Sequence, residues 1–151
     1  RVNTFLEPHM KIGELAQIAK CTVETVRYYE KVGLLPAPAR TAANFRRYGP
    51  DHIERLRFIR NCRALDMSQD EIRSLLELTD QPAEKCGSIN AVFDKHIAHV
   101  EERMRELLNL KQQMTALRER CQAEQTIGDC GILQGLAAME NEPTHERHTH
   151  L

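Results

Sequence analysis

The proline-free stretch from Gly87 to Arg120 constrains the fold of this chain more than any other feature. Its apolar residues recur mainly at intervals of seven, on one face of a helix: Phe93, Ile97, Val100, Met104, Leu107, Leu110, Met114 and Leu117. This spacing predicts a long amphipathic helix over 86–120 whose apolar stripe needs a partner of comparable length. The chain has no second helix that long, so we expect a homodimer. The alternative is a helix packed on its own domain.

Three cysteines frame this helix, with Cys86 before it and Cys121 and Cys130 after it. At a rise of about 1.5 Å per residue, roughly 33 helical residues span about 50 Å. A metal–sulfur bond is only about 2.3 Å for zinc. Cys86 therefore cannot share a metal ion with Cys121 of its own chain. In an antiparallel dimer it can share one with Cys121 and Cys130 of the second copy.

The cysteine pattern also limits the kind of metal. Thiolates select soft or borderline ions, and Cys121 and Cys130 alone would favour linear coordination. A third thiolate, from Cys86 of the second copy, raises the ligand charge to −3 and favours divalent cadmium, lead, mercury or zinc over copper(I) and silver. The alternative is that these thiols are buried as small apolar groups. Cys21 and Cys62 are expected to be such packing residues.

Histidines suggest a second, imidazole-rich metal site. His96 and His99 lie three residues apart on one face of the long helix, and the polar tail carries His145, His148 and His150. The alternative is a solvated pair of histidines and a disordered tail.

The N-terminal half reads as a series of short helices. Residues 11–20 and 23–31 suit a helix-turn-helix, with Thr22 as the N-cap of the second helix and Gly33 at its C-terminal end. Residues 40–48 suggest a small wing, which Phe45 and Tyr48 can anchor to the core. Further helices begin at Pro50 and at Ser68, where Ser68 and Glu71 form a capping box.

Composition narrows the class of protein. The chain has 151 residues, five cysteines and no apolar run long enough for a membrane span, so we expect a cytoplasmic protein with reduced thiols. Residues 1–9 read as a remnant of an expression vector. Residues 10–78 carry 12 Lys and Arg against 9 Asp and Glu, whereas 79–151 carry 8 against 12. The basic half can face phosphates. An enzyme is not expected, because no nucleophile–base pair or phosphate-binding loop stands out.

Four motifs in the N-terminal half resemble the MerR family of transcription regulators: Ile12-Gly13-Glu14-Leu15-Ala16, Thr25-Val26-Arg27-Tyr28-Tyr29-Glu30, Gly33-Leu34-Leu35-Pro36 and Asn44-Phe45-Arg46-Arg47-Tyr48. Three further segments resemble the cadmium- and lead-responsive subgroup (CadR and PbrR): Phe58 to Met67, Cys86-Gly87 and Cys130 to Gln134.

The resemblance implies a mainly α-helical fold. A winged helix-turn-helix DNA-binding domain (10–79) would precede an antiparallel coiled-coil dimerisation helix (86–120). A metal-binding loop with a short C-terminal helix (121–139) and a mobile His-rich tail (140–151) would follow. The resemblance also implies that the homodimer binds double-stranded promoter DNA and, with metal bound, bends and untwists it so that RNA polymerase can engage both promoter elements.

The family pattern assigns DNA contacts by position: Arg27, Tyr28 and Tyr29 on the recognition helix, Arg40, Phe45, Arg46 and Tyr48 in the wing, and Arg63 beyond it. Arginine suits guanine edges or phosphates, and tyrosine hydroxyls suit phosphates. Alternatively, Tyr28 is a core residue and Phe45 only an anchor of the wing.

The sequence thus predicts a transcription activator that responds to cadmium or lead. The alternatives are a zinc- or mercury-responsive regulator of the same family, or a cytoplasmic thiolate protein that buffers metal and binds no DNA.

Overall fold

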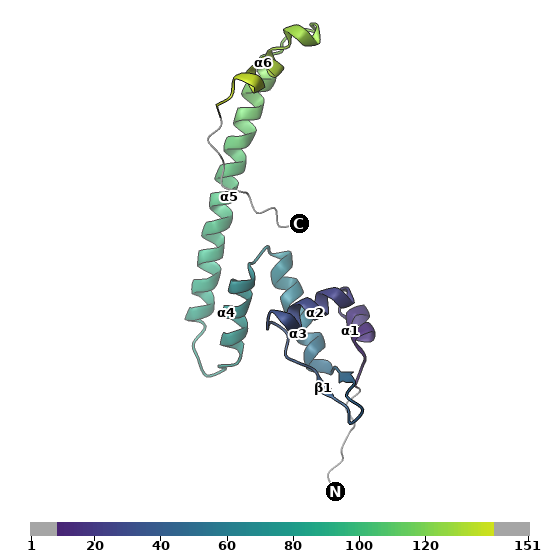
Figure 1. Ribbon diagram of the computed structural model, residues 1–151. Helices are drawn as coiled ribbons and strands as arrows, with labels where there is room; N and C mark the ends of the chain where they lie inside the picture. The colour runs from purple at the N-terminus through teal and green to yellow at the C-terminus, as the bar shows by residue number, and fades with distance from the viewer. Residues whose placement is uncertain (1–8, 141–151) are drawn as a thin grey trace. The chain divides into compact units, whose positions relative to one another are not determined.

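The computed structural model describes residues 9–140, which are mainly helical (Figure 1). The chain divides into two compact units, Arg1–His96 and Ile97–Leu151, and the boundary falls within one long helix. No helix among residues 9–140 combines the length and the apolar character that crossing a bilayer requires.

The first unit begins with the predicted helix-turn-helix. Helix α1 (Ile12–Ile18) packs against α2 (Val23–Lys31) and against α3 (Pro50–Ala64). The Thr22 hydroxyl caps α2 by accepting a hydrogen bond from the Thr25 N–H at 3.1 Å. Gly33 follows α2 with φ of 76°, a left-handed conformation that glycine adopts without strain. The local signals for this motif therefore predicted it correctly.

The wing is a two-stranded antiparallel sheet. In it β1 (Ala39–Arg40) pairs with β2 (Arg46–Arg47), and Arg40 lies opposite Arg46. Asn44 makes the turn possible with φ of 65°. Beyond β2, Tyr48 exchanges two backbone hydrogen bonds with Met10, both 2.9 Å long, which fasten the base of the wing to the start of the domain.

Helix α4 (Gln69–Thr79) begins at the predicted capping box of Ser68 and Glu71, and its residues Leu75 and Leu76 are buried.

Two apolar clusters hold the first unit together. One cluster joins α1, α2, the base of the wing and α3: Met10, Leu15, Ala16, Ala19, Val26, Leu35, Tyr48 and Leu56. The other joins the ends of α2 and α3 to α4: Leu34, Ile59, Cys62, Met67, Ile72, Leu75 and Leu76.

Helix α5 (Gly87–Glu119) is a single unbroken helix of 33 residues, as predicted, and none of its residues is buried in the described part of the chain. Its stripe is largely exposed at Phe93, Ile97, Val100, Met104, Leu107 and Met114. A 3₁₀ turn, η1 (Ile127–Asp129), leads into α6 (Gly131–Ala138).

Helix α6 returns onto the end of α5. A Cβ atom at Gly131 would lie 2.6 Å from the Arg120 carbonyl oxygen, and one at Gly135 would lie 2.6 Å from the Arg120 Nη1. Glycine at both positions lets the two helices approach this closely. Gly128 and Gly131 are the two glycines that the sequence places between or beside Cys121 and Cys130, where a tight loop would be expected. At Gly128 the nearest atom would lie 4.0 Å away, so the close packing falls instead on Gly131 and Gly135.

Candidate metal and DNA-binding sites

Cys130, one of the predicted metal ligands, directly precedes α6. Backbone N–H groups of Leu133 and Ile132 hydrogen-bond its sulfur and hold the pKa of the Cys130 thiol below its usual value. The neighbouring Cys121 side chain lowers the pKa of the Cys130 thiol further, by a smaller amount. Because the thiolate is the form that binds metal, a lowered pKa favours the form of Cys130 that could coordinate a soft ion.

Hydrogen bonds within the loop fix its two ends. The Arg118 guanidinium donates to the Cys121 carbonyl oxygen at 2.8 Å, and the Thr126 hydroxyl donates to the Asp129 carboxylate at 2.9 Å. The donor set fits a soft cation, since Cys121 and Cys130 are partly exposed and neither is in a disulfide.

The remaining cysteines differ in burial. Cys86 is exposed immediately before α5, where a metal or a second chain can reach it. Cys62 is buried in the second apolar cluster, and burial raises the pKa of its thiol. Burial also raises the pKa of Cys21, against the opposing charge of Arg60. Both thiols pack as the sequence predicted, in their poorly coordinating protonated form.

Glu71 and His96 form a polar contact between α4 and α5. The His96 Nδ1 lies 3.1 Å from the Glu71 carboxylate, and the His96 Nε2 lies 2.8 Å from the Leu65 carbonyl oxygen. Burial opposes ionisation of Glu71, but the Ser68 N–H and the His96 imidazole outweigh it and lower the pKa of the carboxyl. The carboxylate therefore caps α4 and faces His96 at the same time.

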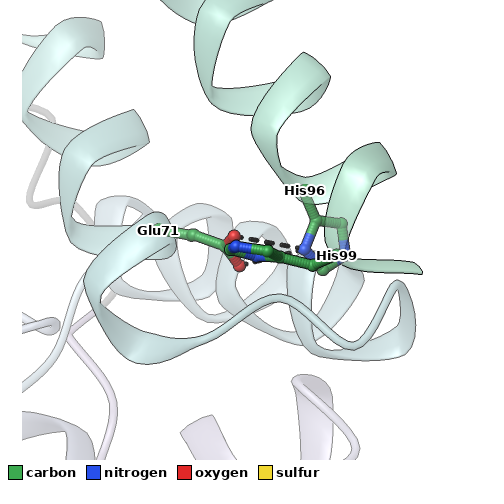
Figure 2. Close-up of side chains that lie close together, drawn as sticks. All are labelled: Glu71, His96 and His99. Atoms are coloured by element: carbon green, nitrogen blue, oxygen red, sulfur yellow. Dashed lines mark hydrogen bonds and ion pairs between the residues drawn. The ribbon is translucent and has the colours of Figure 1, made fainter. Parts of the chain in front are cut away.

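His99 lies one turn beyond His96 on the same helix, so helical geometry sets the two imidazoles side by side. One possible ligand atom from each of Glu71, His96 and His99 lies within 4.8 Å of the other two. Figure 2 shows the three side chains gathered together. One carboxylate and two imidazoles are a ligand set that suits zinc or cadmium. The predicted tail ligands His145, His148 and His150 fall outside the described residues.

The predicted DNA contacts of α2 have different surroundings. Arg27 is exposed. Tyr28 is also exposed, and the side-chain amide of Gln69 donates a hydrogen bond to its hydroxyl. Tyr29 is partly buried against both apolar clusters, and burial raises its pKa. Of the three predicted contacts on α2, Arg27 and Tyr28 are thus the exposed ones.

The three other predicted arginine contacts, Arg40, Arg46 and Arg63, each make a hydrogen bond within the domain. The Arg40 guanidinium donates to the Asn44 carbonyl oxygen at 3.3 Å and to its side-chain oxygen at 3.2 Å. Arg46 pairs with Glu30 at 3.3 Å. The Arg63 guanidinium donates to the Met67 carbonyl oxygen at 2.7 Å, beyond the end of α3.

Of the two predicted anchors of the wing, Tyr48 packs in the core and Phe45 does not. The side chain of Tyr48 is 0% exposed and its hydroxyl donates a hydrogen bond to Glu30, so its assignment as a DNA contact is replaced by a role in the core. Burial and that hydrogen bond raise the pKa of Tyr48 to about 12. Phe45 is 70% exposed at the wing, so it does not anchor the wing to the core.

A basic cleft of about 570 Å³ lies among α1, α2 and the wing. Four cations and a single carboxylate line it, together with three apolar residues: Arg27, Lys31, Arg40, Arg46, Glu30, Ile12, Ala37 and Pro38. This surface has the charge that a DNA phosphate requires.

Sequence reasoning missed Glu30 and Lys31 in this cleft and Glu71 beside His96. Glu30 forms hydrogen bonds with Arg46 and Tyr48, which lie 16 and 18 residues further along the sequence. Glu71 forms one with His96, which lies 25 residues further along. No local spacing reveals such contacts. The available signal for Glu71 was its capping box, which fixes its backbone but not its second partner.

Family comparisons cover most of the chain. Residues 10–79 match the MerR HTH family of regulatory proteins, and residues 53–117 match the family described as MerR, DNA binding.

Individual proteins similar to this chain are also named as regulators. The HTH-type transcriptional regulator ZntR homolog of Haemophilus influenzae is 51% identical, over 74% of this chain and 82% of its own length. The mercuric resistance operon regulatory protein of Serratia marcescens is 33% identical, over 89% and 92%.

Solved structures include the transcription regulator PbrR691 from Ralstonia metallidurans CH34 in complex with lead(II). It is 52% identical, with a TM-score of 0.77, over 84% of this chain and 98% of that one. The transcriptional regulator MerR from Bacillus megaterium MB1, in complex with mercury(II), is 27% identical with a TM-score of 0.68. The helix-turn-helix, the wing and the long helix are consistent with these similarities. The chain belongs to the MerR family of transcription regulators.

Proposed function

We propose that this protein is a metal-responsive transcription activator that binds promoter DNA as a homodimer. A divalent soft metal, cadmium or lead, is its effector. Metal binding leads the dimer to bend and untwist the promoter, so that RNA polymerase engages both promoter elements. The protein acts in the cytoplasm, where that DNA lies.

The stabilised Cys130 thiolate carries this proposal. Hydrogen bonds from the N–H groups of Leu133 and Ile132 favour the charged form of the sulfur before any metal arrives. Buried cysteines that only fill space behave in the opposite way, as the raised pKa of Cys62 illustrates. Cys121 and Cys130 therefore form the two-thiolate part of a sensor site.

The exposed stripe of α5 supports a dimer. Large apolar side chains along it, including Phe93, Val100 and Leu107, are too numerous to remain in water on one helix. A second copy in antiparallel orientation would cover them. The same orientation would bring Cys86 of one chain to Cys121 and Cys130 of the other, which completes three thiolates.

Three thiolates favour a divalent metal by charge. Softness then favours cadmium, lead and mercury over zinc. The similar regulators solved with lead(II) and with mercury(II) are consistent with this range. A zinc- or mercury-responsive regulator of the same family is the alternative.

Transcription in vitro tests the function. Duplexes that bind the metal-loaded wild type are selected from a random pool, and one is set between the elements of a promoter template. We expect added cadmium or lead to increase transcripts by bacterial RNA polymerase. Binding to the selected duplex should exceed binding to a scrambled one by at least about 10³-fold.

Two controls sharpen this test. The variant Cys130→Ser should bind the duplex but lose the metal-dependent increase in transcripts. Absence of sequence-selective binding, with metal still bound tightly, would instead identify a metal-buffering protein.

We also propose a second metal site at Glu71, His96 and His99, which the tail histidines His145, His148 and His150 can complete. Its support is the 4.8 Å spacing of the three described ligand atoms. Cadmium or zinc fits its imidazoles better than lead does.

Replacing His96 and His99 with alanine is expected to remove one of two bound cadmium ions per chain. Calorimetric titration of the reduced protein measures this stoichiometry, and the ultraviolet thiolate-to-metal absorption of the first site serves as an internal control because it should persist. The triple tail variant with alanine at 145, 148 and 150 should also lower the stoichiometry. If both variants bind as much cadmium as the wild type, the second site does not exist.

A further inference from the structure

The basic cleft contains one negatively charged residue, whose charge has the same sign as that of DNA phosphates. Four cations line it, and Glu30 is the single carboxylate among them. A carboxylate repels phosphates, so its presence on a DNA-facing surface calls for a reason.

Two hydrogen bonds from beyond α2 hold this carboxylate. Its Oε2 accepts from the Arg46 guanidinium at 3.3 Å, and its Oε1 accepts from the Tyr48 hydroxyl. The side chain of Glu30 is only 13% exposed, whereas that of Arg46 is 44% exposed. Glu30 thus lies beneath Arg46 and leaves part of the guanidinium facing solvent.

The wing does not depend on Glu30 for its attachment. Tyr48 is fixed by its two backbone hydrogen bonds to Met10, and its ring packs edge-on against the buried His52 at 5.2 Å. The His52 ring in turn bonds the Gly49 N–H and the Pro36 carbonyl oxygen. Since the base of the wing is already held, the Glu30 carboxylate acts mainly on the side chain of Arg46.

We propose that Glu30 is a positioning residue for DNA recognition. Its carboxylate holds the Arg46 guanidinium in one orientation between α2 and the wing, so that Arg46 meets a backbone phosphate only when α2 is in the correct register. Its negative charge also weakens binding of phosphates at other registers. This inference rests on the proposed binding of promoter DNA.

The variant Glu30→Gln tests the inference, because glutamine keeps the size and one acceptor but loses the charge. Dissociation constants are measured for the selected duplex and for a scrambled duplex over a range of salt concentrations. We expect affinity for scrambled DNA to rise, since one repulsive charge is gone, and discrimination between the duplexes to fall about 10-fold. The variant Glu77→Gln makes the same charge change on an exposed part of α4 and should leave discrimination unchanged.

A double-mutant cycle with Arg46→Ala separates positioning from folding. If Glu30 orients Arg46, then in the Arg46→Ala background Glu30→Gln should cause a much smaller loss of discrimination, limited to the effect of removing one repulsive charge. A variant that lowers the melting temperature and weakens binding to both duplexes equally would overturn the inference, as would unchanged discrimination in Glu30→Gln. A wild type that does not discriminate would instead overturn the proposed function, and the inference with it.

Discussion

Replacing Cys86 with serine is expected to weaken the binding of the first cadmium or lead ion by at least about 100-fold. Loss of a partner that merely orients a metal ligand already costs about 10–100-fold, and Cys86 is expected to be a ligand itself. With two thiolates left, the site loses one negative charge and the preference for divalent ions that the charge creates. The measurement is a titration of the reduced dimer with cadmium, lead, zinc and mercury, followed by thiolate-to-metal ultraviolet absorption.

The matched control is Cys21→Ser, which removes a thiol that is partly buried beside the first apolar cluster. It should bind metal as the wild type does. If Cys86→Ser also binds all four metals with wild-type affinity, Cys86 is a structural residue and the sensor is a two-cysteine site. The assignment to divalent metals would then have to be withdrawn. Reduced affinity for every divalent ion, in contrast, would support a site shared between chains and rank the metals.

Features of this fold that depend on neighbours in the sequence could be predicted. The cap at Thr22, the capping box of Ser68 and Glu71 and the left-handed turn at Gly33 each depend on residues within one helical turn. The length of α5 was equally accessible, because a proline-free heptad pattern over so many residues has few alternatives.

Side-chain partners across the fold could not be predicted. Tyr48 looked suited to contact a phosphate, but its position beyond β2 turns the ring into the core, where its hydroxyl meets Glu30. Phe45 looked like an anchor because it is aromatic, but the turn at Asn44 leaves it in solvent. Both errors come from reading residue type without the direction in which the strand points it.

The candidate metal loop shows the same division between local and tertiary features. The short spacing of Cys121 and Cys130 was enough to predict them as ligands. Backbone N–H groups at the start of α6 lower the pKa of Cys130. Helix α6 can pack against Arg120 at the end of α5 because Gly131 and Gly135 have no Cβ atom. That packing depends on tertiary contacts, so sequence spacing alone does not predict the lowered pKa of Cys130.

Replacing Leu107 with glutamate is expected to dissociate the dimer. Leu107 lies in the middle of the α5 stripe and is 52% exposed in the single chain. In a two-fold symmetric dimer the substitution occurs twice. Each copy forfeits about 1.5–3 kcal/mol of apolar burial and adds the cost of an unpaired charge in an apolar seam. At about 1.4 kcal/mol per tenfold change, the dimer dissociation constant should rise by at least about 10³-fold.

Analytical ultracentrifugation measures this change, and Gln112→Glu serves as the control because residue 112 lies off the heptad stripe of the same helix and is exposed. The monomeric variant should keep a folded DNA-binding domain, since both apolar clusters lie before residue 97. It should nevertheless lose the absorption of a three-thiolate site, because Cys86 would have no second chain to reach. A monomer that retained this absorption would require Cys86 to meet Cys121 within one chain. An unbroken helix of 33 residues forbids that meeting, so such a result would refute the antiparallel arrangement itself.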